Sequence, residues 1–453
     1  MEALFRSPLG ALLAQPWVDP AGLFGLQRWY LPLSRLWAAA NVAGGDVDRF
    51  RAEASLSSAV LWAAPAIEQL LGRQQRREAE SAARRDDWER ALFGSSGEDA
   101  ATLARRRRSA ATAHQAMRAA FYPLLFPQRP PSVRWRIDPP AEVRARLAAL
   151  LADPDALYAA APDAGSVEAS VSWLQDGRRE TWWRAPTPSP RLLARPGSER
   201  LYARVIEPAD RPAEATLVLG NGLGIEFDVL TLVRDPGAAL ADHGWRVIEP
   251  VSPYHGLRGM PGTYGGEPFL ASAPTATVDL IAGQAVETAL LVAACRARFG
   301  GPVAVAGISM TSFVMQQVAG RCDLWPAASR PDAAMLISHS GRLEDVTFGG
   351  TLAAAVGLDR EMARAGWTRE QLRLLAPLID APPRPALPPE RILSVLGTTD
   401  RWVPYGDGAA VAEAWRLPEE NVFRYPLGHL GMPVQLVRDG APFARLRRVL
   451  SGG

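Results

Sequence analysis

The stretch PVAVAGISMTSFVMQQVAG, residues 302–320, carries most of what this sequence predicts. Its apolar run predicts a buried strand, which passes through Gly307-Ile308-Ser309-Met310-Thr311 into a segment with helical spacing. Strand, sharp turn and helix in this order are the context of the G-x-S-x-G motif, which exposes a nucleophilic serine at the C-terminal end of a sheet. Ser309 is therefore the candidate nucleophile. Thr311 replaces the usual second glycine and leaves the activity of the motif open.

Short apolar runs alternate with helical stretches on both sides of this motif. Runs of this length and continuity predict strands that are covered on both faces. They occupy residues 215–220, 245–252, 302–307, 333–338, 391–397 and 421–426, with a further leading-edge strand at 202–208. Helical periodicity marks 276–299 and 406–416. We therefore expect residues 191–453 to form a mostly parallel sheet flanked by helices.

The first part of the chain differs in composition and in hydrophobic pattern. Residues 1–190 are rich in Arg, Ala and Trp, and residues 50–120 have the spacing of two or three amphipathic helices. Proline-rich breaks follow at 127–132, 139–140 and 186–190. A length of 453 residues also favours two domains or one enlarged domain. Residues 1–190 are expected to be a mainly helical extension or cap.

Composition excludes several kinds of chemistry. All 50 basic residues are arginine, so a Schiff-base lysine, a phosphate-loop lysine and a Ser-Lys dyad are ruled out. The two cysteines form no metal-binding pattern, and the net charge of +2 does not favour nucleic-acid binding. We expect no metal and no organic cofactor. The N-terminus lacks the pattern of a secretory signal, and we expect a cytoplasmic protein without a spanning helix.

A serine nucleophile needs a base, and without lysine the base must be histidine. In enzymes built on this motif the order along the chain is serine, acid, histidine. His429, in YPLGHLGMP after the last predicted strand, fits this order. Asp400 follows the predicted strand 391–397 and is the preferred acid. Glu344 and Asp345, after the strand 333–338, are the alternatives.

Two backbone N–H groups should bind the oxyanion that forms during acyl transfer. One belongs to Met310, directly after the nucleophile, and the other to the loop after the strand 215–220. This loop contains three glycines in five residues, so its backbone can approach a ligand closely, and we assign the second N–H to Leu223. Asn221, His255 and Arg258 lie at predicted strand ends and are candidates for substrate contact. For Arg258, anchoring of its own loop is an equal alternative.

These features together resemble the α/β-hydrolase superfamily. The segment VSPYHGLRGMP (251–261), the helix around Val278-Asp279-Leu280, the GISM turn and DVTFGG (345–350) are similar to the α/β-hydrolase domain-containing protein 18 family. The resemblance covers about residues 200–440. It implies the α/β-hydrolase fold, a triad of Ser309, Asp400 and His429, and an ester or lipid acyl substrate.

The resemblance is incomplete at the site. Thr311 and Ser312 replace two glycines of the family, and Gly220-Asn221-Gly222-Leu223-Gly224 replaces a more polar oxyanion loop. These departures leave the triad intact and the substrate open.

Three functions follow as hypotheses. The first is hydrolysis of a carboxylic ester, of a small molecule or a lipid, through an acyl-enzyme. The second is acyl transfer to another acceptor on the same triad, and the third is a non-catalytic scaffold of the same fold. The arginine run 105–108 favours a solvated helical face. Together with the apolar segment 119–127, it leaves open a peripheral membrane contact or a lid. The oligomeric state is not predicted.

Overall fold

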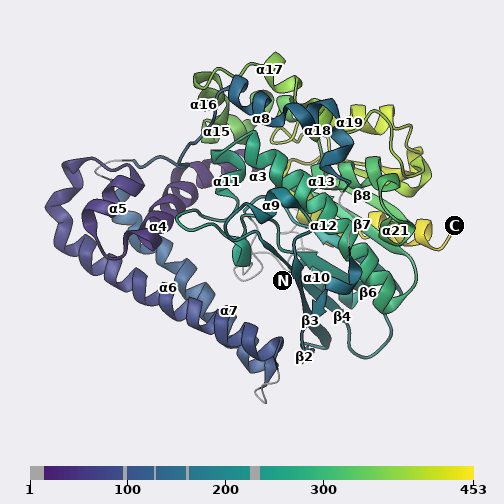
Figure 1. Ribbon diagram of the computed structural model, residues 1–453, viewed down its shortest axis with the longest axis horizontal. Coiled ribbons are helices and arrows are strands. Elements are labelled where there is room, and N and C mark those ends of the chain that lie inside the picture. Colours follow the sequence, from purple (N-terminus) through teal and green to yellow (C-terminus); the bar gives the residue numbers. More distant parts are fainter. Residues whose placement is uncertain (1–14, 95–98, 127–128, 160–162, 225–234, 453) are drawn as a thin grey trace.

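The computed structural model describes residues 15–94, 99–126, 129–159, 163–224 and 235–452. A single ten-stranded sheet forms its centre (Figure 1). The strands are β1 (Glu168–Ala169), β2 (Trp173–Gln175), β3 (Arg178–Pro186), β4 (Arg200–Pro208), β5 (Ala215–Gly220), β6 (Trp245–Pro250), β7 (Val303–Ile308), β8 (Ala333–Ile337), β9 (Ile392–Gly397) and β10 (Val422–Tyr425). Their order is β1-β3-β4-β6-β5-β7-β8-β9-β10, and β2 pairs with β3. The six strands from β6 to β10 along this order are parallel, whereas β3 and β4 pair antiparallel.

Helices cover both faces of this sheet. The helices of this part are α9 (Pro190–Leu193), α10 (Pro236–Asp242), α11 (Glu267–Ala271), α12 (Thr275–Phe299), α13 (Met310–Arg321), α14 (Leu343–Gly349), α15 (Thr351–Val356), α16 (Leu358–Arg364), α17 (Arg369–Arg373), α18 (Ala376–Ile379), α19 (Tyr405–Ala414), α20 (Gly431–Arg438) and α21 (Ala441–Leu450). Alternate side chains of the strands point to opposite faces. On β5, Val218 joins the large apolar cluster under α12 and α13, whereas Leu217 and Leu219 join the cluster under α10, α20 and α21.

The N-terminal part is mainly helical, as expected. Its helices are α3 (Val18–Gly25), the π-helix η1 (Leu26–Tyr30), α4 (Leu31–Ala43), α5 (Val47–Ala54), α6 (Ala64–Leu92), α7 (Ala100–Ala116), the 3₁₀ segment η3 (Met117–Leu125) and α8 (Pro140–Ala152). Figure 1 shows α6 and α7 as a long hairpin beside the sheet-containing body. The buried Arg35 on α4 pairs with the buried Glu267 on α11 at 2.7 Å, and the large apolar cluster runs through both parts. The two parts therefore share one core.

Helix α12 is long and apolar enough to span a membrane. Its apolar window is completely buried inside the protein, where it packs as a core helix.

Three strands, β1 to β3, lie before residue 190, in the part that was expected to be a mainly helical extension. β3 carries arginine, glutamate and threonine before its two adjacent buried tryptophans, because it is an antiparallel strand near the sheet edge. Such a strand lacks the continuous apolar run that marks a central parallel one. The strand expected at the leading edge over 202–208 is β4, which is third from the edge because β3 pairs with it and β1 and β2 pair with β3. The remaining strand predictions and the two central helices are confirmed, and the chain has the α/β-hydrolase fold.

Candidate active site

The turn between β7 and α13 holds Ser309 in an unusual backbone conformation. Its φ is 56° and its ψ is −113°, and its N–H donates to the carbonyl of Ile337 on β8 at 2.9 Å. A Cβ on Gly307 would lie 2.3 Å from the backbone oxygen of Thr311, so only glycine fits at that position. The tight turn raises the Ser309 hydroxyl above the C-terminal ends of the strands.

The unusual Thr311 is accommodated by a glycine on the neighbouring strand. A Cβ at Gly220, on β5, would lie only 2.8 Å from the Thr311 Cβ. The Thr311 hydroxyl accepts a hydrogen bond from the Ile308 N–H at 3.0 Å and lies 3.1 Å from the Ile308 carbonyl oxygen. Thr311, which stands where the motif usually has its second glycine, thus fits because Gly220 has no side chain.

The structure brings Ser309, His429 and Asp400 into one hydrogen-bonded chain. His429 Nε2 lies 3.0 Å from Ser309 Oγ, and His429 Nδ1 lies 2.7 Å from Asp400 Oδ2. The other carboxylate oxygen of Asp400 accepts hydrogen bonds from the N–H groups of Trp402 at 2.9 Å and Val403 at 3.1 Å. The Trp402 ring stacks on the imidazole with centroids 5.2 Å apart. This geometry can transfer the serine proton to His429 and stabilise the resulting imidazolium.

The alternative acids are engaged elsewhere. Glu344 pairs with Arg373 at 2.8 Å, and Asp345 pairs with Arg369 at 2.7 Å. Neither is bonded to His429 in the described part of the chain, so Asp400 is the acid that the structure places at the imidazole.

A second carboxylate, which the sequence analysis did not identify, holds the histidine loop. Asp19 on α3 accepts hydrogen bonds from the backbone N–H of His429 at 2.6 Å and of Leu430 at 2.8 Å. A Cβ at Gly428 would lie 2.3 Å from an Asp19 oxygen, so the glycine before the histidine makes room for this carboxylate. Burial raises the pKa of Asp19, while the two N–H donors and the nearby His429 oppose that shift. No local pattern could have indicated a contact across 410 residues.

The two oxyanion candidates line the same cavity as Ser309. Met310 begins α13, and both Met310 and Leu223 line the cavity that contains the Ser309 hydroxyl. His255 supports the second of these: its Nε2 accepts a hydrogen bond from the Gly224 N–H at 3.1 Å, and its Nδ1 lies 2.9 Å from the Pro253 carbonyl oxygen. Burial lowers the pKa of His255 to about 4, so the ring is neutral near pH 7 and can act as this acceptor.

The structure does not place Asn221, His255 or Arg258 where a substrate would touch them. All three are buried, and none lines the cavity at Ser309. Arg258 is fully buried, where it binds both oxygens of Glu287 at 2.7 and 2.8 Å and the carbonyls of Val251 and Ser198. The requirement to neutralise a buried guanidinium explains this arrangement. Arg258 therefore anchors its own loop, and His255 binds the backbone of the loop that follows β5.

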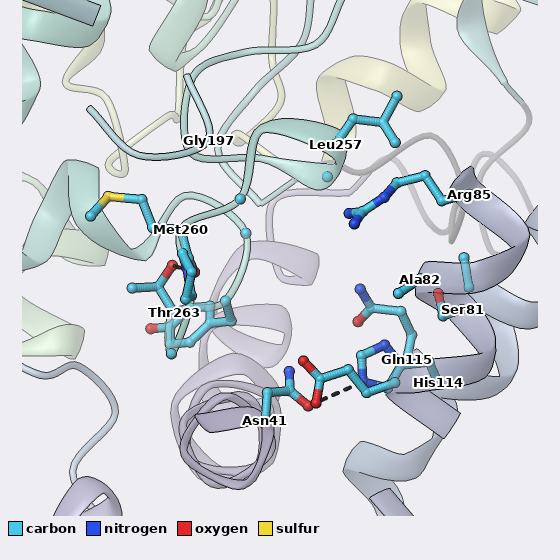
Figure 2. A pocket seen from close by; sticks show the side chains of 18 of the residues that line it. Asn41, Ser81, Ala82, Arg85, His114, Gln115, Gly197, Leu257, Met260 and Thr263 are labelled. Atoms are coloured by element: carbon cyan, nitrogen blue, oxygen red, sulfur yellow. Dashed lines mark hydrogen bonds between the residues drawn. The ribbon is translucent and has the colours of Figure 1, made fainter. Parts of the chain in front are cut away.

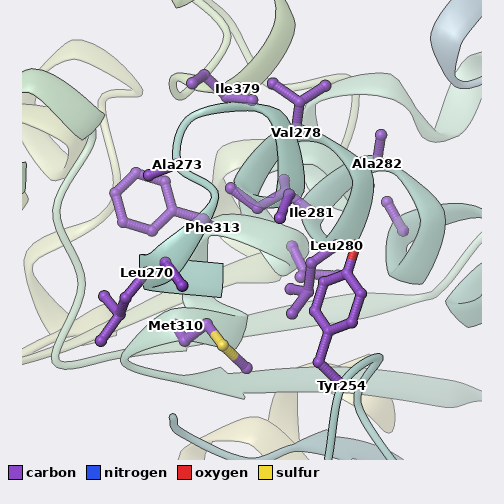
Figure 3. Close-up of a cluster of buried hydrophobic side chains, with 14 of the residues drawn as sticks. Tyr254, Leu270, Ala273, Val278, Leu280, Ile281, Ala282, Met310, Phe313 and Ile379 are labelled. Atoms are coloured by element: carbon purple, nitrogen blue, oxygen red, sulfur yellow. The ribbon is translucent and has the colours of Figure 1, made fainter. Parts of the chain in front are cut away.

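The cavity next to Ser309 is small and apolar. Its volume is about 70 Å³, and its polar lining consists of little beyond Ser309, His429 and two threonines. The apolar lining includes Phe269, Leu270, Ala273, Phe313, Val346, Leu352, Ala353, Met362 and Val403. Figure 3 shows that Leu270, Ala273, Met310 and Phe313 also belong to the packed cluster around α12. One wall of the cavity is therefore part of the rigid core.

A larger cavity lies elsewhere, and its lining mixes charged, polar and apolar residues. It has a volume of about 660 Å³ and lies between α4, α6, α7 and residues 256–265 (Figure 2). Arg85 extends from α6 toward its interior, and His114 is hydrogen-bonded to Asn41 at 3.1 Å. Burial lowers the pKa of His114 to about 4. The His114 ring is hydrogen-bonded to the amide side chains of Asn41 and Gln74 rather than to a serine. The larger cavity is therefore not the one that holds the Ser309–His429 pair.

Within the described residues, no group of three or more His, Cys, Asp or Glu side chains is arranged to hold a metal ion.

No protein-family model and no curated protein matches the chain. Among solved structures, an acetyl xylan esterase from Paenibacillus sp. R4 is similar at 13% identity and a TM-score of 0.45, covering 67% of this chain and 93% of the other. Acetyl xylan esterase 1 from Thermoanaerobacterium sp. JW/SL YS485 is 13% identical with a TM-score of 0.40, covering 67% and 96%. A cold-adapted esterase from an Arctic intertidal metagenomic library is 15% identical with a TM-score of 0.38, covering 61% and 97%. Similarity this low does not identify a substrate.

Proposed function

We propose that this protein is a serine hydrolase that cleaves carboxylic esters with an apolar acyl group through an acyl-enzyme. The observation that carries the proposal is the chain Ser309–His429–Asp400, with contacts of 3.0 and 2.7 Å, at the wall of an apolar cavity. The Ser309–His429 hydrogen bond also counts against a non-catalytic scaffold, because a scaffold has no need of an oriented base.

In the acylation step, His429 Nε2 accepts the hydroxyl proton of Ser309 while Oγ attacks the ester carbonyl carbon. The negative charge then resides on the former carbonyl oxygen, where the N–H groups of Met310 and Leu223 stabilise it. His429 returns its proton to the leaving alcohol as the ester C–O bond breaks, and the acyl group stays on Ser309. Asp400 holds the imidazole in the tautomer that these transfers require.

In the deacylation step, His429 removes a proton from water, and the resulting hydroxide attacks the acyl carbon. The bond to Ser309 Oγ breaks, and His429 returns the proton to that oxygen. The products are a carboxylic acid and the free enzyme. If an alcohol took the place of water, the same steps would transfer the acyl group.

The apolar cavity supports an apolar acyl chain as the group bound beside Ser309. Burial of each methylene contributes about 0.8 kcal/mol, which favours longer chains until the cavity is full. A charged acyl group would lose its hydration among Phe269, Val346, Leu352 and Met362 without gaining a counter-ion.

Covalent labelling tests the nucleophile. A fluorophosphonate probe should label the wild-type protein and the Ser451→Ala control, whose serine is exposed at the far end of α21, but not Ser309→Ala. Absence of labelling in the folded wild type, or equal labelling of Ser309→Ala, would refute the proposal.

A chain-length series of soluble esters tests the assigned acyl cavity. Ala353 lines it and is buried, whereas its neighbour Ala354 on α15 is exposed. Ala353→Phe should lower kcat/KM for butanoate esters by at least about tenfold relative to acetate esters, because the new ring fills the cavity. Ala354→Phe should leave the ratio unchanged. An equal butanoate-to-acetate ratio in wild type and Ala353→Phe would place the acyl group elsewhere.

A further inference from the structure

An exposed group of aromatic side chains lies beside the active-site loop, and we name it the aromatic face. It consists of Trp17, Phe24, Trp29, Tyr30, Tyr122 and Phe126, from α3, η1 and η3 and their ends. Phe126 is 74% exposed and Phe24 is 58% exposed. Among the described residues, these six are all but one of the large aromatic side chains that are exposed, the other being Phe299. Concentration of this kind marks an interaction site.

Specific contacts join the two segments into one surface. Arg118 donates to the Tyr30 hydroxyl at 3.1 Å, and Arg129 donates to the backbone oxygen of Gln27 at 2.8 Å. Phe24 packs edge-to-face on Trp29, and Tyr122 does so on Phe126. The aromatic rings are therefore held in place by the fold, although their outer faces remain in solvent.

The aromatic face is continuous with the catalytic machinery. Gln27 donates to the backbone oxygen of Ala355 at 2.9 Å, on α15, whose Leu352 and Ala353 line the acyl cavity. Asp19, on the same helix as Phe24, holds the His429 loop. A substrate that reaches this face is thus close to the elements around Ser309.

The exposed charges of the segments that form this face are of one sign. In the described residues 15–30, 117–126 and 129, the cationic side chains are Arg28, Arg118 and Arg129. The acidic residue in the same segments is Asp19, which is buried. Aromatic rings flanked by arginines, with no exposed carboxylate in these described segments, are complementary to an anionic lipid surface, where rings insert at the headgroup level and arginines pair with phosphates.

We propose that the aromatic face is an interfacial docking surface that seats this enzyme on an anionic lipid surface. The proposal deepens the proposed function, on which it rests, by placing lipid esters among the substrates and by naming the surface through which they are reached. It also gives residues 119–126 a specific role as part of the membrane-contacting surface; the last residue of the apolar segment 119–127 lies outside the described residues.

Vesicle binding of the full chain tests the surface without reference to turnover. The wild type should co-float with vesicles of 70% phosphatidylcholine and 30% phosphatidylglycerol more strongly than with pure phosphatidylcholine vesicles. Phe24→Ser/Phe126→Ser should lower the partition coefficient by at least about tenfold, because two ring insertions are lost. Leu174→Ser/Leu193→Ser, which alters two comparably exposed apolar side chains on β2 and α9, is the matched control and should bind as wild type does. Arg28→Gln/Arg129→Gln should lower binding to the anionic vesicles alone.

Hydrolysis of a soluble acetate ester separates this proposal from the proposed function. The Phe24→Ser/Phe126→Ser protein should keep wild-type activity on that ester while losing vesicle binding. A wild type that hydrolyses the ester but does not bind anionic vesicles overturns the docking surface alone. So does equal loss of binding in the leucine control, or a dimer in sedimentation velocity that the phenylalanine substitutions dissociate. An inactive wild type that binds vesicles through Phe24 and Phe126 overturns the proposed function alone.

Discussion

Replacement of Asp19 should reduce turnover strongly, although this residue touches neither the substrate nor the nucleophile. Its carboxylate accepts the backbone N–H groups of His429 and Leu430 at 2.6 and 2.8 Å, and these bonds fix the loop that carries the base. Hydrogen bonds to a charged partner contribute about 1.5–3 kcal/mol each. Loss of two such bonds, at the lower value, destabilises the observed conformation of the His429 loop by about 3 kcal/mol relative to other loop conformations. The fraction of molecules with the loop in the observed conformation then falls by about 10²-fold.

The expected result for Asp19→Ala is therefore a fall in kcat of about 10²-fold with a smaller change in KM, since the acyl cavity is not altered. Asp19→Asn keeps one acceptor oxygen and should lose less. Asp46→Ala is the matched control, because Asp46 also accepts a backbone N–H, that of Arg49 at the start of α5, far from His429. Its kcat should match the wild type.

The pH dependence distinguishes positioning from general damage. Asp19 is a negative charge near the imidazole, and its removal makes the protonated ring less favourable. The acid limb of kcat/KM should therefore move to lower pH in Asp19→Asn, whereas a merely distorted fold would lower the whole profile without moving it. Wild-type kcat in Asp19→Ala, or an unmoved acid limb in Asp19→Asn, would refute the reasoning.

Two further predictions concern the turn between β7 and α13, which carries Ser309, and the buried histidines. Gly220→Ala places a Cβ 2.8 Å from Thr311, so kcat should fall at least about tenfold, and Gly220→Ala/Thr311→Gly should recover most of it; a double variant no better than the single one would contradict the packing explanation. Burial lowers the pKa of His255 to about 4 and of His339 to about 3. Since the unfolded chain binds these protons near pH 6.5, the neutral rings contribute stability that is complete above about pH 6.5 and is lost as pH falls toward 4 and 3. The urea concentration at the midpoint of unfolding should thus be lower at pH 5 than at pH 7.5, and this decrease should be smaller in His339→Gln than in the wild type. An equal decrease in the wild type and His339→Gln would count against this source of pH dependence.

The sequence by itself determined the parts of this protein that local patterns encode. The central parallel strands are recognisable because each is apolar on both faces. The turn that carries Ser309 is recognisable because strand, turn and helix are contiguous in the sequence. The order of Ser309, Asp400 and His429 follows from loops that each directly succeed a predicted strand. In such a sheet the C-terminal ends of parallel strands share one edge, so the order alone brings the candidates close together.

Only the tertiary structure decided the contacts made between distant segments. Asp19 reaches the His429 loop from a helix 410 residues earlier, and Gly220 makes Thr311 tolerable from a neighbouring strand. Arg258 has the chemistry of a substrate anchor, yet its burial against Glu287 gives it a structural role. Periodicity and motifs describe which way a side chain faces on its own element. They do not specify which element packs against it, and that packing decides whether a polar group binds a ligand or its own fold.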